Sequence, residues 1–296
     1  MSDTDNRIVK AIKEKGKTME AEMSFFDHLE ALRWHLIRAA IAIVFFTILA
    51  FVYDDFVFDT IIMGPRNPDF FSYRMLCKVG EYLGRPGMCI KEIPGKIINT
   101  EMAGQFTLQI NSALIVGITL GFPYLLWELW RFVRPALHEN ERRSASGFVF
   151  YASILFIMGI LFGYYVVTPE SISFLASYQV SKVIENNFTI DSYLSSVATL
   201  TLGTGIVFEL PIIVYVLSSL GILTAKLMRS GRRYAIVGIM IIAAIITPTP
   251  DILTMMVVAI PLFVLYEVGI VVSGVVERRK VKKELAIAAE HSKQSD

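Results

Sequence analysis

Long apolar blocks alternate with short polar segments along most of the chain. A helix that crosses a lipid bilayer needs about 20 predominantly apolar residues, and most of the blocks reach that length. The pattern therefore predicts an all-α membrane protein with six transmembrane helices, at about 34–53, 106–130, 144–168, 192–218, 234–247 and 252–274. The blocks themselves are Trp34–Tyr53, Phe106–Trp127, Ser144–Pro169, Ser192–Ala225, Tyr234–Pro250 and Ile252–Val276.

The last two predicted helices are short. Tyr234–Thr247 holds fourteen residues, or about 21 Å at 1.5 Å per residue, against a hydrocarbon core of roughly 30 Å. Such a pair implies local bilayer thinning or a cavity. The run Thr247-Pro248-Thr249-Pro250-Asp251 predicts a tight turn between the two helices, with Pro248 and Pro250 forming it and Asp251 capping the last helix.

Composition agrees with this pattern. Of the 296 residues 54% are hydrophobic and the mean hydropathy is +0.55, which is too apolar for a soluble domain of this size. The net charge of +1 gives no sign of nucleic-acid binding. Residues 1–23 form a polar extension. Because residues 1–33 lack a short apolar core with a cleavage site, we expect no cleavable signal peptide and a permanent first span.

Charge placement gives the orientation. With side A defined as that of the N-terminus, 20 of the 28 Lys and Arg residues fall on side A and 7 on side B, while Arg38 lies inside the first block. Positively charged loops stay in the cytoplasm. Side A is therefore predicted to be cytoplasmic and to hold both termini, including a basic tail at 277–296. Trp34, Trp127 and Trp130 all fall at side-A ends of spans, where indole rings favour the interface.

Side B is predicted to carry one long periplasmic loop, residues 54–105, with both cysteines, Cys77 and Cys89. A loop of this length is unusual unless it is functional or packed. The periplasmic side is oxidising, so a Cys77–Cys89 disulfide that staples the loop is one interpretation. Two free thiols are the other.

Two acids interrupt the apolar blocks, Glu209 and Glu267. An ionisable residue within a membrane is costly and indicates function by default; the alternative is a buried, hydrogen-bonded structural carboxyl. Small residues at 117 and 121 and at 159 and 163 favour close helix packing.

We expect no catalytic activity and no cofactor or metal. The four histidines, at 28, 35, 138 and 291, are too scattered for a metal site, and phosphate-binding loops and nucleophile motifs are missing from the sequence. One alternative function is a proton-coupled secondary transporter of a small solute. It would require inverted repeats, and the sequences that follow Glu209 and Glu267 do not repeat convincingly.

Four motifs resemble those of the TatC family, whose members are the receptor subunit of the twin-arginine protein translocase. His28-Leu29-Glu30-Ala31-Leu32-Arg33 resembles the motif before its first span. Phe132-Val133-Arg134-Pro135-Ala136-Leu137 with Glu141-Arg142-Arg143 resembles its first cytoplasmic loop, and Phe208-Glu209-Leu210-Pro211 its fourth span. The last hairpin, with its proline-rich turn, Ala259-Ile260-Pro261 and Tyr266-Glu267-Val268-Gly269, is similar as well. The likeness runs from about Phe26 to Val276 and covers every span in order, so residues 24–276 are predicted to form one TatC-like membrane domain.

The resemblance implies six helices in a cupped bundle in the inner membrane. It implies that folded proteins cross the membrane using the proton-motive force, together with TatA- and TatB-type single-span partners, in a complex that holds several copies. The substrate implied is a signal peptide with consecutive arginines, bound on the cytoplasmic face.

The site implied for that peptide has one clear match and one departure. Glu141 corresponds to the acid of the first loop, with Phe132 and Leu137 beside it. The second acid of the family falls on Ala31. Asp27, one helical turn earlier on the same face, or the adjacent Glu30 could replace it, and Arg33 completes that motif. Glu209 and Glu267 are implied polar contacts for partner helices or the translocating chain.

Overall fold

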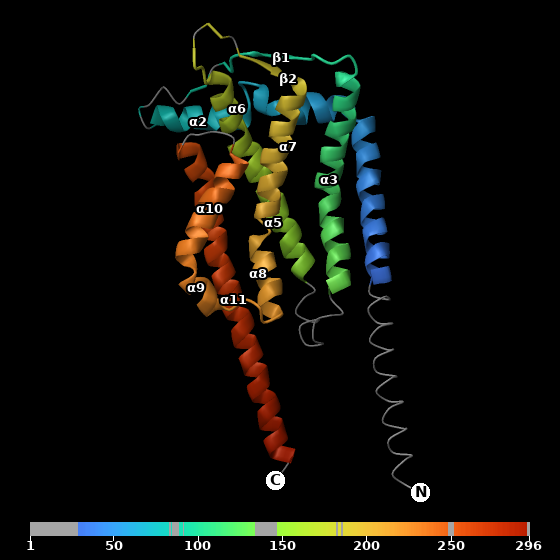
Figure 1. Cartoon of the computed structure of the whole chain (residues 1–296), viewed down its shortest axis with the longest axis vertical. Coiled ribbons are helices and arrows are strands. Elements are labelled where there is room, and N and C mark those ends of the chain that lie inside the picture. Colours follow the sequence, from blue (N-terminus) through green and yellow to red (C-terminus); the bar gives the residue numbers. More distant parts are fainter. Residues whose placement is uncertain are drawn as a thin grey trace, which may run out of the picture.

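The fold is a bundle of long helices that run side by side (Figure 1). The computed structural model describes residues 29–82, 84, 89–90, 92–133, 147–181, 183–184, 186–247 and 252–294. Among these residues, five helices are long and apolar enough to cross a membrane: Leu29–Val52, Gly104–Val133, Val149–Ser177, Ile190–Ser219 and Met255–Lys282. A mostly helical, multi-pass membrane protein is thus confirmed. Helix α10 (Arg232–Ile246), with 15 residues, is shorter than these five.

The first helix (Leu29–Val52) packs directly on α3 (Gly104–Val133). Glycines on α3 make this approach possible. A Cβ atom at Gly117 would lie 2.8 Å from the backbone of Thr47, and one at Gly121 would lie 3.2 Å from the Cα of Ile43. Two backbones approach this closely only where a side chain is missing, so the small residues hold the two helices together.

The next helices pack in the same way. The third long helix consists of α5 (Phe148–Phe162), a π-helical turn η6 (Gly163–Val167) and α6 (Thr168–Ser177). A Cβ at Gly159 would lie 2.8 Å from the Cα of Gly205, and one at Gly163 would lie 3.0 Å from the Cα of Thr201. The predicted close packing through Gly159 and Gly163 is therefore confirmed, and its partner is α7 (Ile190–Val207).

The fourth long helix is interrupted in its middle. Helix α7 ends at Val207 and α8 (Leu210–Ser219) begins after Glu209. Pro211 lies in the first turn of α8, where its missing N–H costs no hydrogen bond, whereas inside a continuous helix it would remove one. The continuous helix expected over 192–218 is thus two helices, separated at Phe208 and Glu209.

The last helices form a hairpin followed by a long extension. Helix α9 (Ala225–Ser230) is capped by the Thr224 hydroxyl and leads into α10; α11 spans Ile252–Gln294. With 43 residues, α11 is about 65 Å long and extends beyond the other helices on side A (Figure 1). The Ser218 hydroxyl donates to Ser273 at 2.9 Å, and the Ala225 N–H donates to Glu277 at 3.0 Å, so α8 and α9 are fixed to α11.

Side B is covered by short elements within the segment predicted as a loop. They are η1 (Phe56–Ile62), η2 (Gly64–Arg66), α2 (Phe71–Tyr82) and β1 (Lys96–Ile98). Strand β1 pairs in parallel with β2 (Asn187–Thr189), with Ile97 opposite Phe188. This two-stranded ladder is absent from the all-α prediction, because three-residue strands that pair across 91 positions of sequence have no local signal.

Tyrosine hydroxyls hold this cover to the helices. Tyr164 and Tyr193 donate to the carbonyls of Ile61 and Ile62, at 2.6 and 2.8 Å. The buried Tyr73 hydroxyl lies 2.9 Å from the carbonyl oxygens of both Pro65 and Pro169, and burial raises the pKa of this phenol. The bonds of Tyr73 and Tyr193 are buried and satisfy polar groups that would otherwise lack a partner.

Two clusters of buried residues form most of the core. One lies beneath the side-B cover and joins the first helix, α3, α6 and α7: Ala50, Val57, Ile62, Tyr73, Ile93, Leu108, Ala113, Ile172, Ala176, Tyr193, Leu194 and Val197. The other joins α7 to the α10–α11 hairpin: Val167, Leu200, Phe208, Ile239, Ala243, Ile246, Val258, Ala259 and Leu262.

Candidate functional site

A buried carboxylate lies near the side-A end of α3. The Glu128 side chain is 2% exposed, and burying a charge without partners is costly. Glu128 has several partners. The Tyr124 hydroxyl donates to Oε1 at 3.0 Å, Arg131 Nη1 lies 3.2 Å from the same oxygen, and Oε2 is bonded to His35 Nδ1.

The partners of Glu128 come from two helices, so the carboxylate joins the first helix to α3. His35 and Arg38 belong to the first helix, whereas Tyr124 and Arg131 lie one turn on either side of Glu128 on α3. Arg38 Nη1 stands 3.9 Å from Oε2. The side chains of Arg38 and Arg131 are about half exposed, while that of His35 is 16% exposed. The His35–Glu128 contact is therefore the best protected connection between the two helices at this end.

Phe132 extends this contact toward the end of α3. Its ring lies edge-on to the His35 ring, with centroids 6.3 Å apart. Of the residues predicted to bind a signal peptide, Phe132 thus lies beside the first helix, and Glu30 and Arg33 lie exposed on the first turns of that helix. Asp27, Leu137 and Glu141 fall outside the described residues, as do the predicted turn residues Pro248, Pro250 and Asp251.

Glu128 is not among the residues predicted from the sequence, although it lies in the predicted span 106–130. A signal was present: an acid between two tryptophans, Trp127 and Trp130, within an apolar run. Its partner His35 lies 93 positions away in sequence and carries no pattern of its own.

Glu209 is enclosed at the break between α7 and α8. The residue is 6% exposed, and neither carboxyl oxygen has a hydrogen-bond partner among the residues that the structure describes. Its backbone is satisfied, because its carbonyl accepts from the N–H groups of Ile212 and Ile213 at 2.9 and 3.1 Å. An unpaired buried carboxyl costs free energy, so this group is a candidate for a role beyond packing.

Glu267 has a different environment. Its Oε2 accepts from Arg232 Nη2 at 2.7 Å, and its side chain is 34% exposed. This pair joins α11 to the start of α10, so Glu267 has a structural partner.

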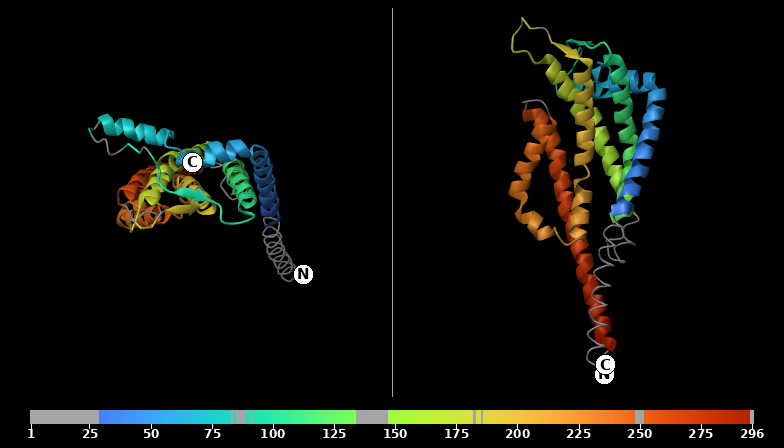
Figure 2. Two further views of the ribbon diagram at one scale, coloured as in Figure 1. Left: turned by 90° about the horizontal axis from the view of Figure 1, so that it is seen from above. Right: turned by 45° about the vertical axis from the view of Figure 1, so that its right-hand side comes forward.

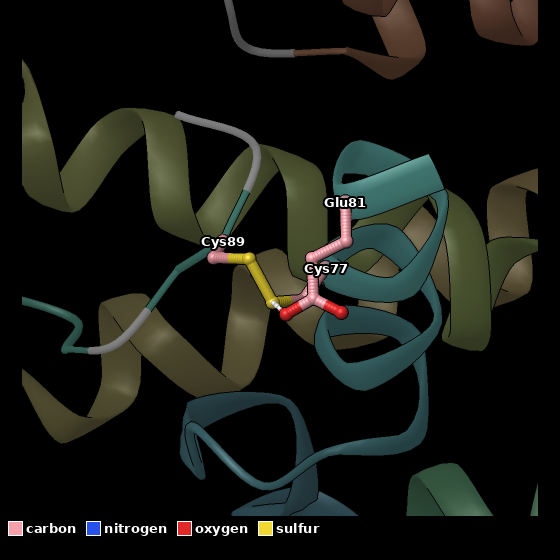
Figure 3. Close-up of a disulfide and its surroundings, with 3 residues drawn as sticks. All are labelled: Cys77, Glu81 and Cys89. Carbon is pink, nitrogen blue, oxygen red and sulfur yellow. Dashed lines mark hydrogen bonds between the residues drawn. A yellow bond between two sulfur atoms is a disulfide. The ribbon is translucent and has the colours of Figure 1, made fainter. Parts of the chain in front are cut away.

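Cys77 and Cys89 are joined by a disulfide, with Glu81 beside it (Figure 3). The two sulfurs and a carboxyl oxygen of Glu81 lie within 4.8 Å of one another, a spacing that could hold a metal. Metal binding requires thiolates, however, and both sulfurs are used in the disulfide.

Comparison with known proteins identifies the family and the fold. The sequence model of the family described as "Sec-independent protein translocase protein (TatC)" matches residues 27–261. The chain belongs to the TatC family. The match begins at Asp27 and includes His35, Glu128 and Glu209, while Glu267 lies beyond it.

Individual TatC proteins agree over nearly the whole chain. The Sec-independent protein translocase protein TatC of Blattabacterium sp. subsp. Periplaneta americana is 34% identical over 89% of this chain and all of its own length. The TatC of Deinococcus radiodurans is 34% identical over 86% of this chain and 87% of its own. A crystal structure described as the twin arginine translocase receptor TatC superposes with a TM-score of 0.62 at 30% identity, over 84% of this chain and 99% of that one.

Proposed function

We propose that this chain is the receptor subunit of a twin-arginine translocase. In this proposal it binds signal peptides with consecutive arginines on side A, which faces the cytoplasm. It then moves folded proteins across the inner membrane, together with TatA- and TatB-type single-span subunits, using the proton-motive force. Membership of the TatC family supports the reaction class, since relatives along the whole chain are named as translocase proteins.

The observation that carries the binding site is the contact of His35 with Glu128 and Phe132. It holds the start of the first helix against the end of α3. Glu30 and Arg33 lie on the first helix, at one side of this junction. At the other side α3 ends at Val133, and residues 134–146, with Leu137 and Glu141, follow it in the sequence. A substrate arginine reaching the junction could therefore meet acids from both segments, and guanidinium pairs best with carboxylates in bidentate geometry.

The topology proposed is six spans with both ends in the cytoplasm, in which α10 is the fifth span along the chain and the shortest. Its 15 residues measure about 22 Å, which requires a thinner bilayer at this place. The polar residues 1–23 and the basic residues 277–296 then lie in the cytoplasm, and 54–105 in the periplasm. The excess of Lys and Arg on side A supports this orientation.

Glu209 is proposed as the polar contact for partner helices or the translocating chain. A carboxyl inside the membrane that has no partner among the described residues is available for a hydrogen bond to another chain. Because Glu209 is only 6% exposed, a partner reaches it only after the residues packed around it move apart. Glu267 already has Arg232, so its assignment to partner contact is the weaker of the two.

A photoreactive side chain at Phe132 tests the site. It should capture an Arg-Arg signal peptide and not the matched Lys-Lys peptide. The same group at Met102, fully exposed on side B, serves as the control and should capture neither. Equal capture of both peptides at Phe132 would refute substrate recognition at this junction.

Substitution of the acids tests their roles. We expect Glu141→Ala to weaken peptide binding more than Glu30→Ala, because Glu141 alone keeps the family position. The same comparison with Asp27→Ala decides which residue replaces the acid missing at Ala31. Peptide affinity measured for the three variants separates these cases. Equal losses for Glu141→Ala and Glu30→Ala would mean that Glu30 has taken over the second position fully.

A further inference from the structure

Helix α2 leaves the bundle at the level of the side-B membrane interface. Its first turn is fixed to the third long helix, where the Ser72 hydroxyl donates to the Tyr165 carbonyl and the Phe71 ring contacts the Tyr165 ring edge-on at 6.0 Å. Tyr165 lies 17 positions after Phe148, the side-A start of α5, or about 26 Å along the helix. A hydrocarbon core is roughly 30 Å thick, so this contact lies close to its side-B boundary.

The helix runs across the bundle axis, not along it. Figure 1 shows α2 nearly perpendicular to the long helices, and the view from above in Figure 2 shows it extending past their outline. Its outer turns therefore lie over the space beside the bundle. In a membrane protein this space is filled by lipid or by another protein.

One face of α2 is apolar and exposed. Phe71, Met75 and Tyr82 are 57, 57 and 92% exposed, and their spacing puts them within about 40° of one another around the helix. The exposed cations Arg74 and Lys78 border this stripe on one edge. Apolar and aromatic residues bordered by basic ones are the pattern of helices that lie in the headgroup region of a bilayer.

The stripe continues the lipid-facing surface of the spans. Phe71 and Arg74 line a groove of about 1000 Å³ together with Leu120, Leu161 and Tyr165, which belong to α3 and to the third long helix. Leu120 and Leu161 are 50 and 48% exposed in the middle part of helices that cross the membrane. The face of α2 that bears Phe71 is thus turned toward the membrane and not away from it.

The disulfide lies on the opposite face. Cys77 and the buried Tyr73 are each about 160° from Met75 around the helix. The Cys77–Cys89 bond joins this face to the segment that returns to β1 (Figure 3). The bond and the Tyr73 hydrogen bonds together fix the rotation of α2, so that the stripe faces the membrane.

We propose that α2 is an interfacial helix that docks on the side-B leaflet of the bilayer through Phe71, Met75 and Tyr82. The stripe contacts phospholipid: the acyl chains lie on the stripe, and the headgroups lie near Arg74 and Lys78. Three observations support phospholipid as the partner. The helix lies close to the side-B boundary of the hydrocarbon core, its apolar stripe continues the exposed surface of the spans, and cations border the stripe. This docking is independent of which peptide binds on side A.

The test uses a photoreactive benzoylphenylalanine at single positions of the full-length protein in native membranes. Position 75 or position 82 carries the probe in the stripe, and position 81 is the matched control on the same helix. Glu81 is exposed and about 120° from Met75 around the helix. Phospholipid adducts are quantified by mass spectrometry of the peptide that contains the probe.

We expect lipid adducts at positions 75 and 82 at about tenfold the yield at position 81, because acyl chains contact only the apolar face of an interfacial helix. Position 82 keeps the proposal testable if the probe at 75 disturbs the fold. Adducts at 75 and 82 to a second copy of the chain or to another protein would overturn it. Equal lipid yields at all three positions, or none, would also overturn it.

Discussion

The connection between His35 and Glu128 can be tested by removing its charge while keeping its shape. Glu128→Gln replaces the buried carboxylate by an amide of nearly the same volume. The Tyr124 hydroxyl still has an oxygen to which it can donate. What is lost is the charge that His35, Arg38 and Arg131 share.

The size of the effect follows from the burial of each partner. A hydrogen bond to a charged group contributes about 1.5–3 kcal/mol, and the His35 bond is the protected one, with side chains 16 and 2% exposed. The two arginines are about half exposed, so each adds about 0–1 kcal/mol. We therefore expect Glu128→Gln to lower the free energy of unfolding by about 1.5–5 kcal/mol.

Detergent-driven unfolding of the purified protein, followed by tryptophan fluorescence, measures this free energy. Trp34 and Trp127 are the sequence neighbours of His35 and Glu128 and report directly on this region. The matched control is Glu267→Gln, which removes the charge from the more exposed pair with Arg232 and should cost about 0–1 kcal/mol.

A double-mutant cycle decides whether the effect belongs to the pair. His35→Gln combined with Glu128→Gln should show a coupling energy of about 1.5–3 kcal/mol, since both residues serve one contact. A coupling below about 0.5 kcal/mol, the range of independent sites, would refute the reasoning. A loss for Glu128→Gln no larger than that for Glu267→Gln would do the same.

Three further predictions concern packing, the disulfide and the buried acid. Gly117→Leu should lower the free energy of unfolding by at least about 1–3 kcal/mol, because its Cβ would meet the Thr47 backbone, whereas Gly238→Leu, with open space around it, should change it little in the same assay. Cys77→Ser opens a loop of 12 positions and should cost about 3 kcal/mol; protease sensitivity of residues 71–95 should rise, and unchanged sensitivity would show that the disulfide holds nothing in place. Glu209→Leu should stabilise the subunit by about 1–3 kcal/mol by removing an unpaired buried carboxyl and yet reduce export of a folded reporter with an Arg-Arg signal peptide; a stabilised variant with full export would remove Glu209 from the mechanism.

Local patterns in the sequence predicted the features that are determined within a single helix. Runs of apolar residues predicted the long helices, and small residues four apart predicted the contact surfaces at Gly117 and Gly159, because both signals lie within a single segment. The break at Glu209 had a local cause, Pro211, yet the sequence suggested one continuous helix. Proline in the middle of an apolar run is compatible with either a kink or a break.

Contacts between distant segments could not be predicted in this way. The His35–Glu128 pair, the β1–β2 ladder and the tyrosine bonds to η1 each join residues about 90 or more positions apart. Nothing in one segment specifies its partner in the other. The segment 54–105 was therefore predicted as a loop, although its described residues include helices and a strand at the side-B end of the bundle.

The ladder between β1 and β2 has a mechanical consequence for the bundle. It connects the segment before α3 to the segment before α7 by backbone hydrogen bonds, and Tyr193 bonds α7 to Ile62 beside it. Side B is thus cross-linked, whereas the side-A junction between the first helix and α3 depends on a few side chains around Glu128. If the first helix and α3 separate, we expect their side-A ends to move apart while their side-B ends stay in place.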